Sequence, residues 1–94
     1  SVMIVKTIII MKAIEELENT TEKSFRDSFY FLCQYENILT IEACFKNPKI
    51  SNKITPEIIS YGLLGSARTN KIEHAKALLN FAQKYKNINI EEIY

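Results

Sequence analysis

Helix-start signals in this 94-residue chain recur at a fixed distance and limit the folds open to it. When the sequence is aligned with itself at an offset of 34 residues, Thr21, Thr55 and Asn89 fall in register. Threonine and asparagine side chains accept a hydrogen bond from a backbone N–H in the first turn of a helix, so all three are candidate N-caps. Thr55 carries the clearest signal, because Pro56 and Glu57 follow it and both residue types are favoured in a first turn. The period therefore predicts a repeated helical unit.

Apolar side chains repeat at the same offset. Phe25, Phe29 and Cys33 are four residues apart, which is the spacing of one helix face. Their counterparts one period later are Ile59, Leu63 and Ala67. The matching stripes after each corner are Ile38, Ile41, Cys44 and Phe45, then Ile72, Ala75, Leu78 and Leu79. We expect helices over residues 3–18, 22–36, 38–46, 56–69 and 71–86, with a further turn over 90–94.

Asparagines mark the boundaries within the two units. Asn37 and Asn70 lie at the corners, where asparagine tolerates the left-handed conformation and also caps the following helix. Asn47 precedes Pro48, and a residue before proline avoids the helical region. We therefore expect the helix that begins at residue 38 to end there, and residues 48–54 to form a loop.

The N-terminal segment admits two interpretations. Residues 2–10 are rich in β-branched side chains and suit a strand, but no partner strand is evident in the rest of the chain. We favour a helix over residues 3–18, similar to the second helix of a preceding unit. The predicted fold is all-α, a stack of helix-turn-helix hairpins with about five helices and a period of about 34 residues. One domain covers residues 1–94, with units at 21–54 and 55–88 and a tail at 89–94.

No residue pattern in the chain indicates catalysis, a metal or a cofactor. Cys33 and Cys44 lie among apolar residues and fit buried free thiols, and His74, the single histidine, fits a surface position. Gly62 and Gly65 lack the Lys-Ser/Thr ending of a phosphate loop. At helical spacing, the two glycines instead favour the close approach of another helix. We expect a non-enzyme without cofactor or metal.

Two free cysteines and the lack of a cleavage site favour an intracellular, reducing compartment: cytoplasm, organelle matrix or a host cell. The apolar residues 1–11 are too few to span a bilayer, so no membrane association is expected. The net charge is +1, but its distribution is uneven. Residues 13–42 carry seven acidic against two basic side chains, whereas residues 46–90 carry eight basic against two acidic ones.

Parts of both units are similar to pentatricopeptide repeats. Residues 32–45 resemble the middle of such a repeat, with a Leu-Cys pair, a corner, an alanine and a terminal phenylalanine. Residues 54–79 resemble it too, although Glu36 and Asn70 replace the usual corner glycine. Residues 63–89 are more weakly similar to an ankyrin repeat. The pentatricopeptide resemblance implies single-stranded RNA binding along the first helices of the units.

Two functions remain open at this level. The first is a binding or scaffold module for another protein or for a second copy of the chain, because the ends of a short repeat array are apolar. Exposed aromatic residues such as Tyr85 and Tyr94 are the expected contacts. The alternative is RNA binding through the basic half, residues 46–90. Its candidate contacts, expected along one edge, are Lys49, Lys53, Arg68 and Lys71.

Overall fold

The computed structural model describes residues 2–93, and this part of the chain contains helices and loops but no strand. The all-α class predicted from the sequence is therefore confirmed. The helices between residues 2 and 93 are α1 (Val2–Asn19), α2 (Glu22–Tyr35), α3 (Ile38–Lys46), α4 (Pro48–Ser51), α5 (Pro56–Arg68), α6 (Ile72–Lys86) and α7 (Ile90–Ile93).

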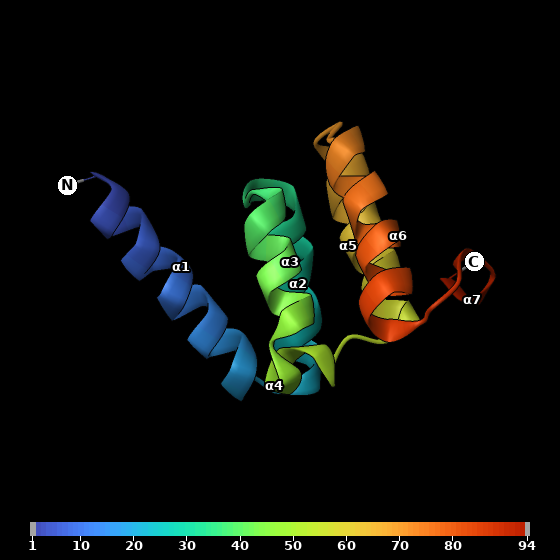
Figure 1. The fold of residues 1–94 in the computed structure, drawn as a ribbon, viewed down its shortest axis with the longest axis horizontal. Coiled ribbons are helices and arrows are strands. Elements are labelled where there is room, and N and C mark those ends of the chain that lie inside the picture. The colour runs from blue at the N-terminus through green and yellow to red at the C-terminus, as the bar shows by residue number, and fades with distance from the viewer. Residues whose placement is uncertain (1, 94) are drawn as a thin grey trace.

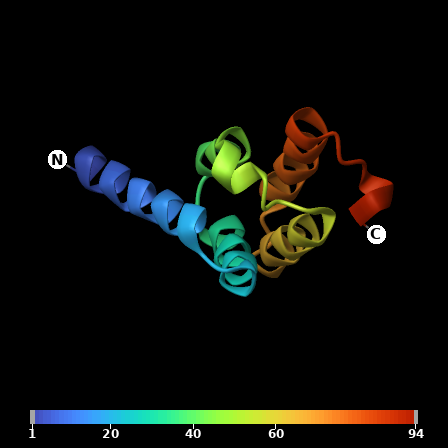
Figure 2. The same cartoon turned by 90° about the horizontal axis from the view of Figure 1, so that it is seen from below.

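Two antiparallel helix pairs, α2 with α3 and α5 with α6, form the body of the molecule (Figure 1). The pairs lie side by side, so that α2 packs on α5 and α3 packs on α6. Seen from below, the four helices occupy the corners of one block, while α1 extends away on one side and α7 lies on the other (Figure 2). The projecting α1 makes the molecule elongated, with extents of 43 × 27 × 23 Å.

The expected caps open the first helix of each pair. The side chains of Thr21 and Thr55 accept a hydrogen bond from the backbone N–H of the third residue of α2 and of α5. Asn89 stands directly before α7, where its backbone N–H donates to the carboxylate of Glu92 at 2.7 Å. These bonds satisfy N–H groups that have no partner inside a helix, which explains why the 34-residue period of caps predicts the helix starts well.

The two corner asparagines divide the roles expected of each. The side chain of Asn37 accepts a hydrogen bond from the backbone N–H of Thr40 at 2.8 Å and so caps α3. Asn70 adopts the left-handed conformation, with φ of 56°, but α6 begins after Lys71 without a side-chain cap. The prediction of a left-handed corner is thus confirmed at Asn70, and the prediction of a cap at Asn37.

A short helix occupies part of a segment for which we predicted a loop. The second helix does end at Lys46, but α4 begins directly afterwards. Its start has the same physical basis as that of α5, because Pro48 occupies the first turn and the Asn47 side chain accepts from the N–H groups of Lys49 and Ile50. The loop prediction is therefore wrong over residues 48–51, and with α7 the described helices exceed the five that we expected.

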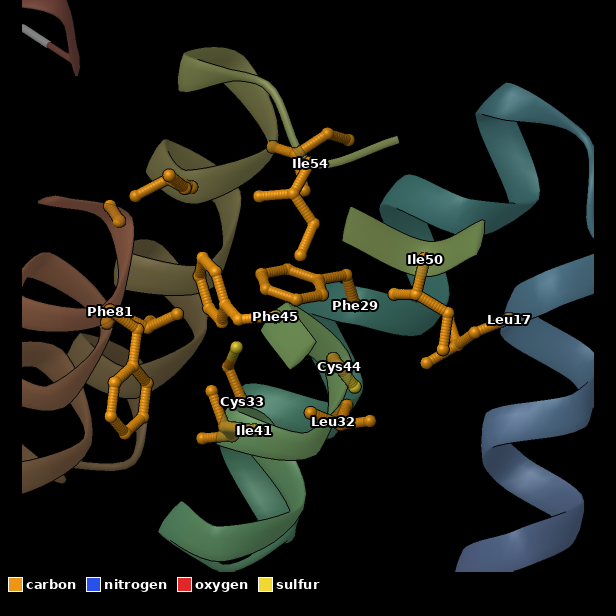
Figure 3. Packing of buried hydrophobic residues seen from close by; sticks show 14 of the residues in the cluster. Leu17, Phe29, Leu32, Cys33, Ile41, Cys44, Phe45, Ile50, Ile54 and Phe81 are labelled. Carbon is orange, nitrogen blue, oxygen red and sulfur yellow. The ribbon is translucent and has the colours of Figure 1, made fainter. Parts of the chain in front are cut away.

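The hydrophobic core lies where the two helix pairs meet (Figure 3). Phe29 stacks on Phe25 with ring centroids 5.9 Å apart, and it meets the ring of Phe45 edge-on at 6.4 Å. Cys33 and Cys44 are free thiols within this core, as predicted. The buried apolar side chains are Leu17, Phe25, Phe29, Leu32, Cys33, Ile41, Cys44, Phe45, Ile50, Ile54, Ile58, Ile59, Leu78, Phe81, Ala82 and Ile88.

The glycines of α5 permit its close contact with α2, as their spacing predicted. A Cβ atom on Gly65 would lie 2.6 Å from the backbone carbonyl oxygen of Tyr30. A Cβ atom on Gly62 would lie 3.0 Å from the Sγ atom of Cys33 and from the Phe29 ring. Both distances are shorter than an ordinary van der Waals contact, so the spacing between the helices depends on the absence of these atoms.

The buried face of α5 differs from the stripe that we expected. Ile59 is buried, but Leu63 is half-buried and Ala67 is exposed. Ile72, which opens the expected stripe of α6, is also exposed. Helix α5 turns its smallest residues toward α2, because their lack of bulk allows the closest packing. Its buried residues are Ile58, Ile59, Gly62, Gly65 and Ser66.

Candidate protein-interaction surface

The first half of α1 carries a continuous set of exposed apolar side chains. The helix expected over residues 3–18 is confirmed, but Leu17 is its only residue that is buried within the described structure. The N-terminal end of α1 points away from α2 and α3 (Figure 1). No described helix is long and apolar enough to cross a membrane. The exposed apolar side chains of α1 are Val2, Met3, Ile4, Val5, Ile8, Ile9 and Met11.

The C-terminal end of α1 is anchored to the body by apolar and polar contacts. Leu17 points toward Ile50 of α4 (Figure 3). The Lys53 ammonium group donates hydrogen bonds to the backbone carbonyls of Leu17 and Glu18, at 3.0 and 2.8 Å. The Asn47 side-chain amide donates to the Glu18 carboxylate at 2.8 Å. A cation on the last carbonyls of a helix satisfies their lone pairs and opposes the helix dipole, so this anchor sets the direction in which α1 leaves the body.

The apolar residues of the projecting half lie on a different side of α1 from the anchored face. Ile10 is half-buried and, at 100° per residue, lies in line with the buried Leu17. Ile4, Ile8 and Met11 are spaced i, i+4 and i+7 and are turned by roughly 100–160° from Ile10. They therefore form an apolar stripe that faces away from the body. A stripe of this kind is typical of a helix that packs against another surface.

A second apolar surface lies on the body, and we call it the α2–α3 patch: Phe31, Tyr35 and Leu39. All three side chains are more than half exposed. The rings of Phe31 and Tyr35 are stacked, with centroids 6.4 Å apart and planes 10° from parallel. Leu39 follows in the first turn of α3. Because the two rings order each other, the patch presents a firm apolar surface.

The structure does not bring the four predicted basic contacts together. The ammonium group of Lys53 is turned inward onto the end of α1, and Lys49 is exposed with its Nζ atom 4.0 Å from Glu18. Arg68 and Lys71 lie at the other end of α5, which has 13 residues and is therefore about 20 Å long. Our expectation that the four residues share one edge is wrong, because α5 separates them.

Tyr85 is not the exposed aromatic residue that we expected. Its ring packs against Phe45 and Phe81, with centroids 6.3 and 6.0 Å apart. Its hydroxyl donates a hydrogen bond to the Glu42 carboxylate at 2.7 Å, which joins α6 to α3. Tyr85 is therefore part of the interface between the two helix pairs. The other expected contact, Tyr94, lies outside the described residues.

His74 also serves a structural contact rather than a free surface position. It is half-buried, and its Nε2 atom lies 2.6 Å from the backbone carbonyl oxygen of Glu36. This contact joins the first turn of α6 to the C-terminal end of α2. The imidazole therefore holds together the corner region, and the expectation of an exposed histidine is wrong.

A hollow of about 770 Å³ lies between the first turns of α2 and α5, near the end of α1. Glu22 and Glu57 oppose Lys23 and Arg26 on its walls, so its charges are mixed. The Arg26 guanidinium group lies 4.9 Å from the ring centroid of Tyr61. The walls hold no pairing of a nucleophile with a general base, which hydrolytic and transfer chemistry requires.

Neither cysteine has the properties of a reactive thiol. Burial raises the pKa of Cys33, and the nearby Cys44 raises it further. Burial, together with the nearby Glu36 carboxylate, raises the pKa of Cys44 to about 12. The thiolate is the nucleophilic and metal-binding form of cysteine, and at neutral pH both residues stay protonated. Within residues 2–93, no three His, Cys, Asp or Glu side chains are grouped to hold a metal ion.

Comparisons with protein-family models, with curated proteins and with solved structures find no match for this chain. The similarity to pentatricopeptide repeats thus depends on the residues quoted above, and it stays a prediction. The functional assignment therefore depends on the surface that the structure displays.

Proposed function

We propose that this chain is a non-enzymatic protein-binding module whose contact element is the projecting half of α1. The observation that supports the proposal most strongly is the exposure of seven large apolar side chains on this helix, within the part of the chain that the structure describes. Contiguous apolar surface of this kind marks interaction sites on soluble proteins. A helix that is apolar on several sides also requires contacts on more than one side.

The energetics favour a bound rather than a free α1. A helical segment of about ten residues that lacks tertiary contacts is only marginally stable in water. Burying one exposed Ile, Val or Met side chain contributes roughly 1.5–3 kcal/mol before the entropic cost of association. Several such residues on one helix are therefore sufficient to stabilise both the helix and a complex. Docking of an apolar helix onto a complementary surface is a common mode of protein recognition.

We further propose that α2–α3 and α5–α6 are successive units of a helical-repeat stack. Shifting α2 by 34 residues places it over α5, and the same shift places α3 over the first part of α6. The side-by-side packing of α2 on α5 and of α3 on α6 supports this arrangement. In such a stack, the outer face of each terminal unit lacks a neighbour. The α2–α3 patch and α1 both lie on one outer side.

RNA binding remains the alternative, and the geometry favours it less. Phosphate recognition needs basic side chains that converge on one path. Lys53 donates to backbone carbonyls, and Lys49 is separated from Arg68 and Lys71 by the length of α5. The four side chains thus offer two separated contacts in place of one continuous basic edge.

Site-specific photocrosslinking tests the proposed contact element directly. A benzophenone amino acid replaces Ile8 in one variant and Leu64, an equally exposed residue of α5, in the control. We expect protease-sensitive, nuclease-resistant adducts from position 8 in the native host and none above background from position 64. Equal labelling at both positions, or adducts that nuclease removes, would overturn the proposal.

A binding titration with single-stranded RNA of mixed sequence addresses the alternative. The variant Arg68→Glu/Lys71→Glu is compared with the wild-type chain at low and high salt. Under the protein-binding proposal, the two proteins bind RNA equally weakly. Tight binding that falls steeply with salt and is lost in the variant would instead establish the RNA-binding function.

A further inference from the structure

We infer that the partner of α1 is a second copy of this chain, which receives the helix on its α2–α3 patch. The inference rests on the proposed protein-binding function and specifies the partner. It also makes the association reciprocal, because each copy has one projecting α1 and one α2–α3 patch. Two copies related by a two-fold axis would therefore use both surfaces of both chains and form a closed dimer.

The charges around the two surfaces are of opposite sign. From residue 2 to residue 14, the charged side chains are Lys6 and Lys12. From residue 27 to residue 45, they are Asp27, Glu36 and Glu42. The projecting half of α1 is thus basic, and the helices that bear the patch are acidic. Complementary potentials of this kind favour pairing of α1 with the patch and oppose pairing of α1 with another α1.

The position of α1 separates it from the patch of its own chain. The anchor formed by Leu17 and Lys53 holds the C-terminal end of α1 beside α4, and the helix diverges from α2 and α3 toward its N-terminus (Figure 1). Its stripe of Ile4, Ile8 and Met11 is also turned away from the anchored face. A second molecule meets both of these outward surfaces without any change in the anchor.

The apolar area available is that of an ordinary stable interface. Within the described residues, α1 and the patch together expose ten large apolar side chains per copy. At roughly 60–100 Å² for each side chain, they supply roughly 600–1,000 Å² per copy, against about 800 Å² per partner in a standard interface. A dimer therefore needs no further contact surface to reach this size.

Charge reversal on each surface tests the pairing. One variant carries Lys6→Glu/Lys12→Glu on α1, and the other carries Asp27→Lys/Glu36→Lys beside the patch. Light scattering over a concentration series at low salt is expected to give a dimer for the wild-type chain. Each variant alone should dissociate at least tenfold more readily, because like charges then face each other in both contacts. An equimolar mixture of the two variants should regain the dimer, since both of its contacts again join opposite charges.

The control separates this pairing from its competitors. Leu64→Asp introduces a charge at an exposed apolar residue outside both surfaces and should leave the dimer unchanged. Tyr35→Glu provides a second patch variant, and circular dichroism confirms that each protein remains helical. A wild-type chain that stays monomeric at millimolar concentration would overturn the self-association, while crosslinks from position 8 to a different protein would leave the proposed function intact. If the patch variants dimerise like the wild type and only the α1 variant does not, α1 pairs with α1 and the inference is wrong.

Discussion

Replacing Gly65 with alanine is expected to destabilise the protein, although the same change stabilises most helices. The added Cβ atom would lie 2.6 Å from the backbone carbonyl oxygen of Tyr30, whereas ordinary contacts begin near 3.4 Å. A side chain can rotate out of such a contact, but a carbonyl within α2 cannot. The two helices must therefore separate by roughly an ångström along their closest contact, and this loosens the core beneath them.

The magnitude follows from two opposing contributions. Overpacking of a well-filled interface costs about 1–3 kcal/mol, and a backbone obstacle places this site at the upper end. Alanine recovers about 1 kcal/mol relative to glycine in a helix interior. The net loss in the free energy of unfolding is therefore about 2 kcal/mol. For a domain of this size, it corresponds to a decrease in Tm of about 8–16 °C.

Thermal unfolding followed by circular dichroism measures this loss. Gly62→Ala should be milder, because its new Cβ atom meets side chains that can shift, including the Sγ atom of Cys33. Leu64→Ala, at an exposed position of the same helix, is the control and should change stability by less than about 0.5 kcal/mol. An unchanged or raised Tm for Gly65→Ala would refute the close packing of α2 on α5.

Three further predictions concern the anchor, the core hydrogen bond and the thiols. Lys53→Met should speed amide hydrogen exchange in the last turns of α1 and lower stability by about 1–3 kcal/mol, while Lys49→Met should have little effect. Tyr85→Phe should cost about 1.5–3 kcal/mol in urea unfolding, because the buried side of Glu42 loses its donor; an unchanged midpoint would contradict the bond. Burial raises the pKa of Cys44 from 9.0 to about 12, so the folded chain retains a proton that the unfolded chain releases. Its contribution to stability is complete below pH 9 and decreases toward pH 12, and urea titrations of the wild type and Cys44→Ala should differ in this slope.

Local signals in the sequence determine most of the helix boundaries. Thr21 and Thr55 satisfy the first N–H groups of their helices with their own side chains, and this chemistry requires no tertiary context. The same reasoning applied to Asn47 and Pro48 predicts a helix start, but the position was interpreted only as a helix end. The short α4 was missed because a cap with a following proline both ends one helix and begins the next.

Features that depend on long-range packing were predicted less well. Leu63 and Ala67 continue an apolar stripe, yet α5 turns its glycines to α2 because close contact there buries more of the core. Tyr85 and His74 read as surface residues, since their partners Glu42 and Glu36 lie about 40 residues earlier in the chain. No local pattern links such distant residues.

The candidate site shows the same division. The apolar character of residues 1–11 is evident in the sequence, but their exposure follows from the angle at which α1 leaves the body. That angle depends on Lys53, whose ammonium group binds the end of a helix more than 30 residues earlier. The sequence also contains the aromatic cluster of α2, but the exposure of Phe31 and Tyr35 depends on which face α5 covers.

Hydrogen exchange of the backbone amides of α1 tests the central claim most directly. The chain is measured at low micromolar and at near-millimolar concentration, with α5 as the internal reference. We predict rapid exchange over residues 4–11 in the dilute chain and at least tenfold slower exchange when the chain associates, with α5 unchanged. Strong protection of residues 4–11 in the dilute monomer would show that α1 already packs on its own chain. This result would contradict its proposed role as the contact element for a partner.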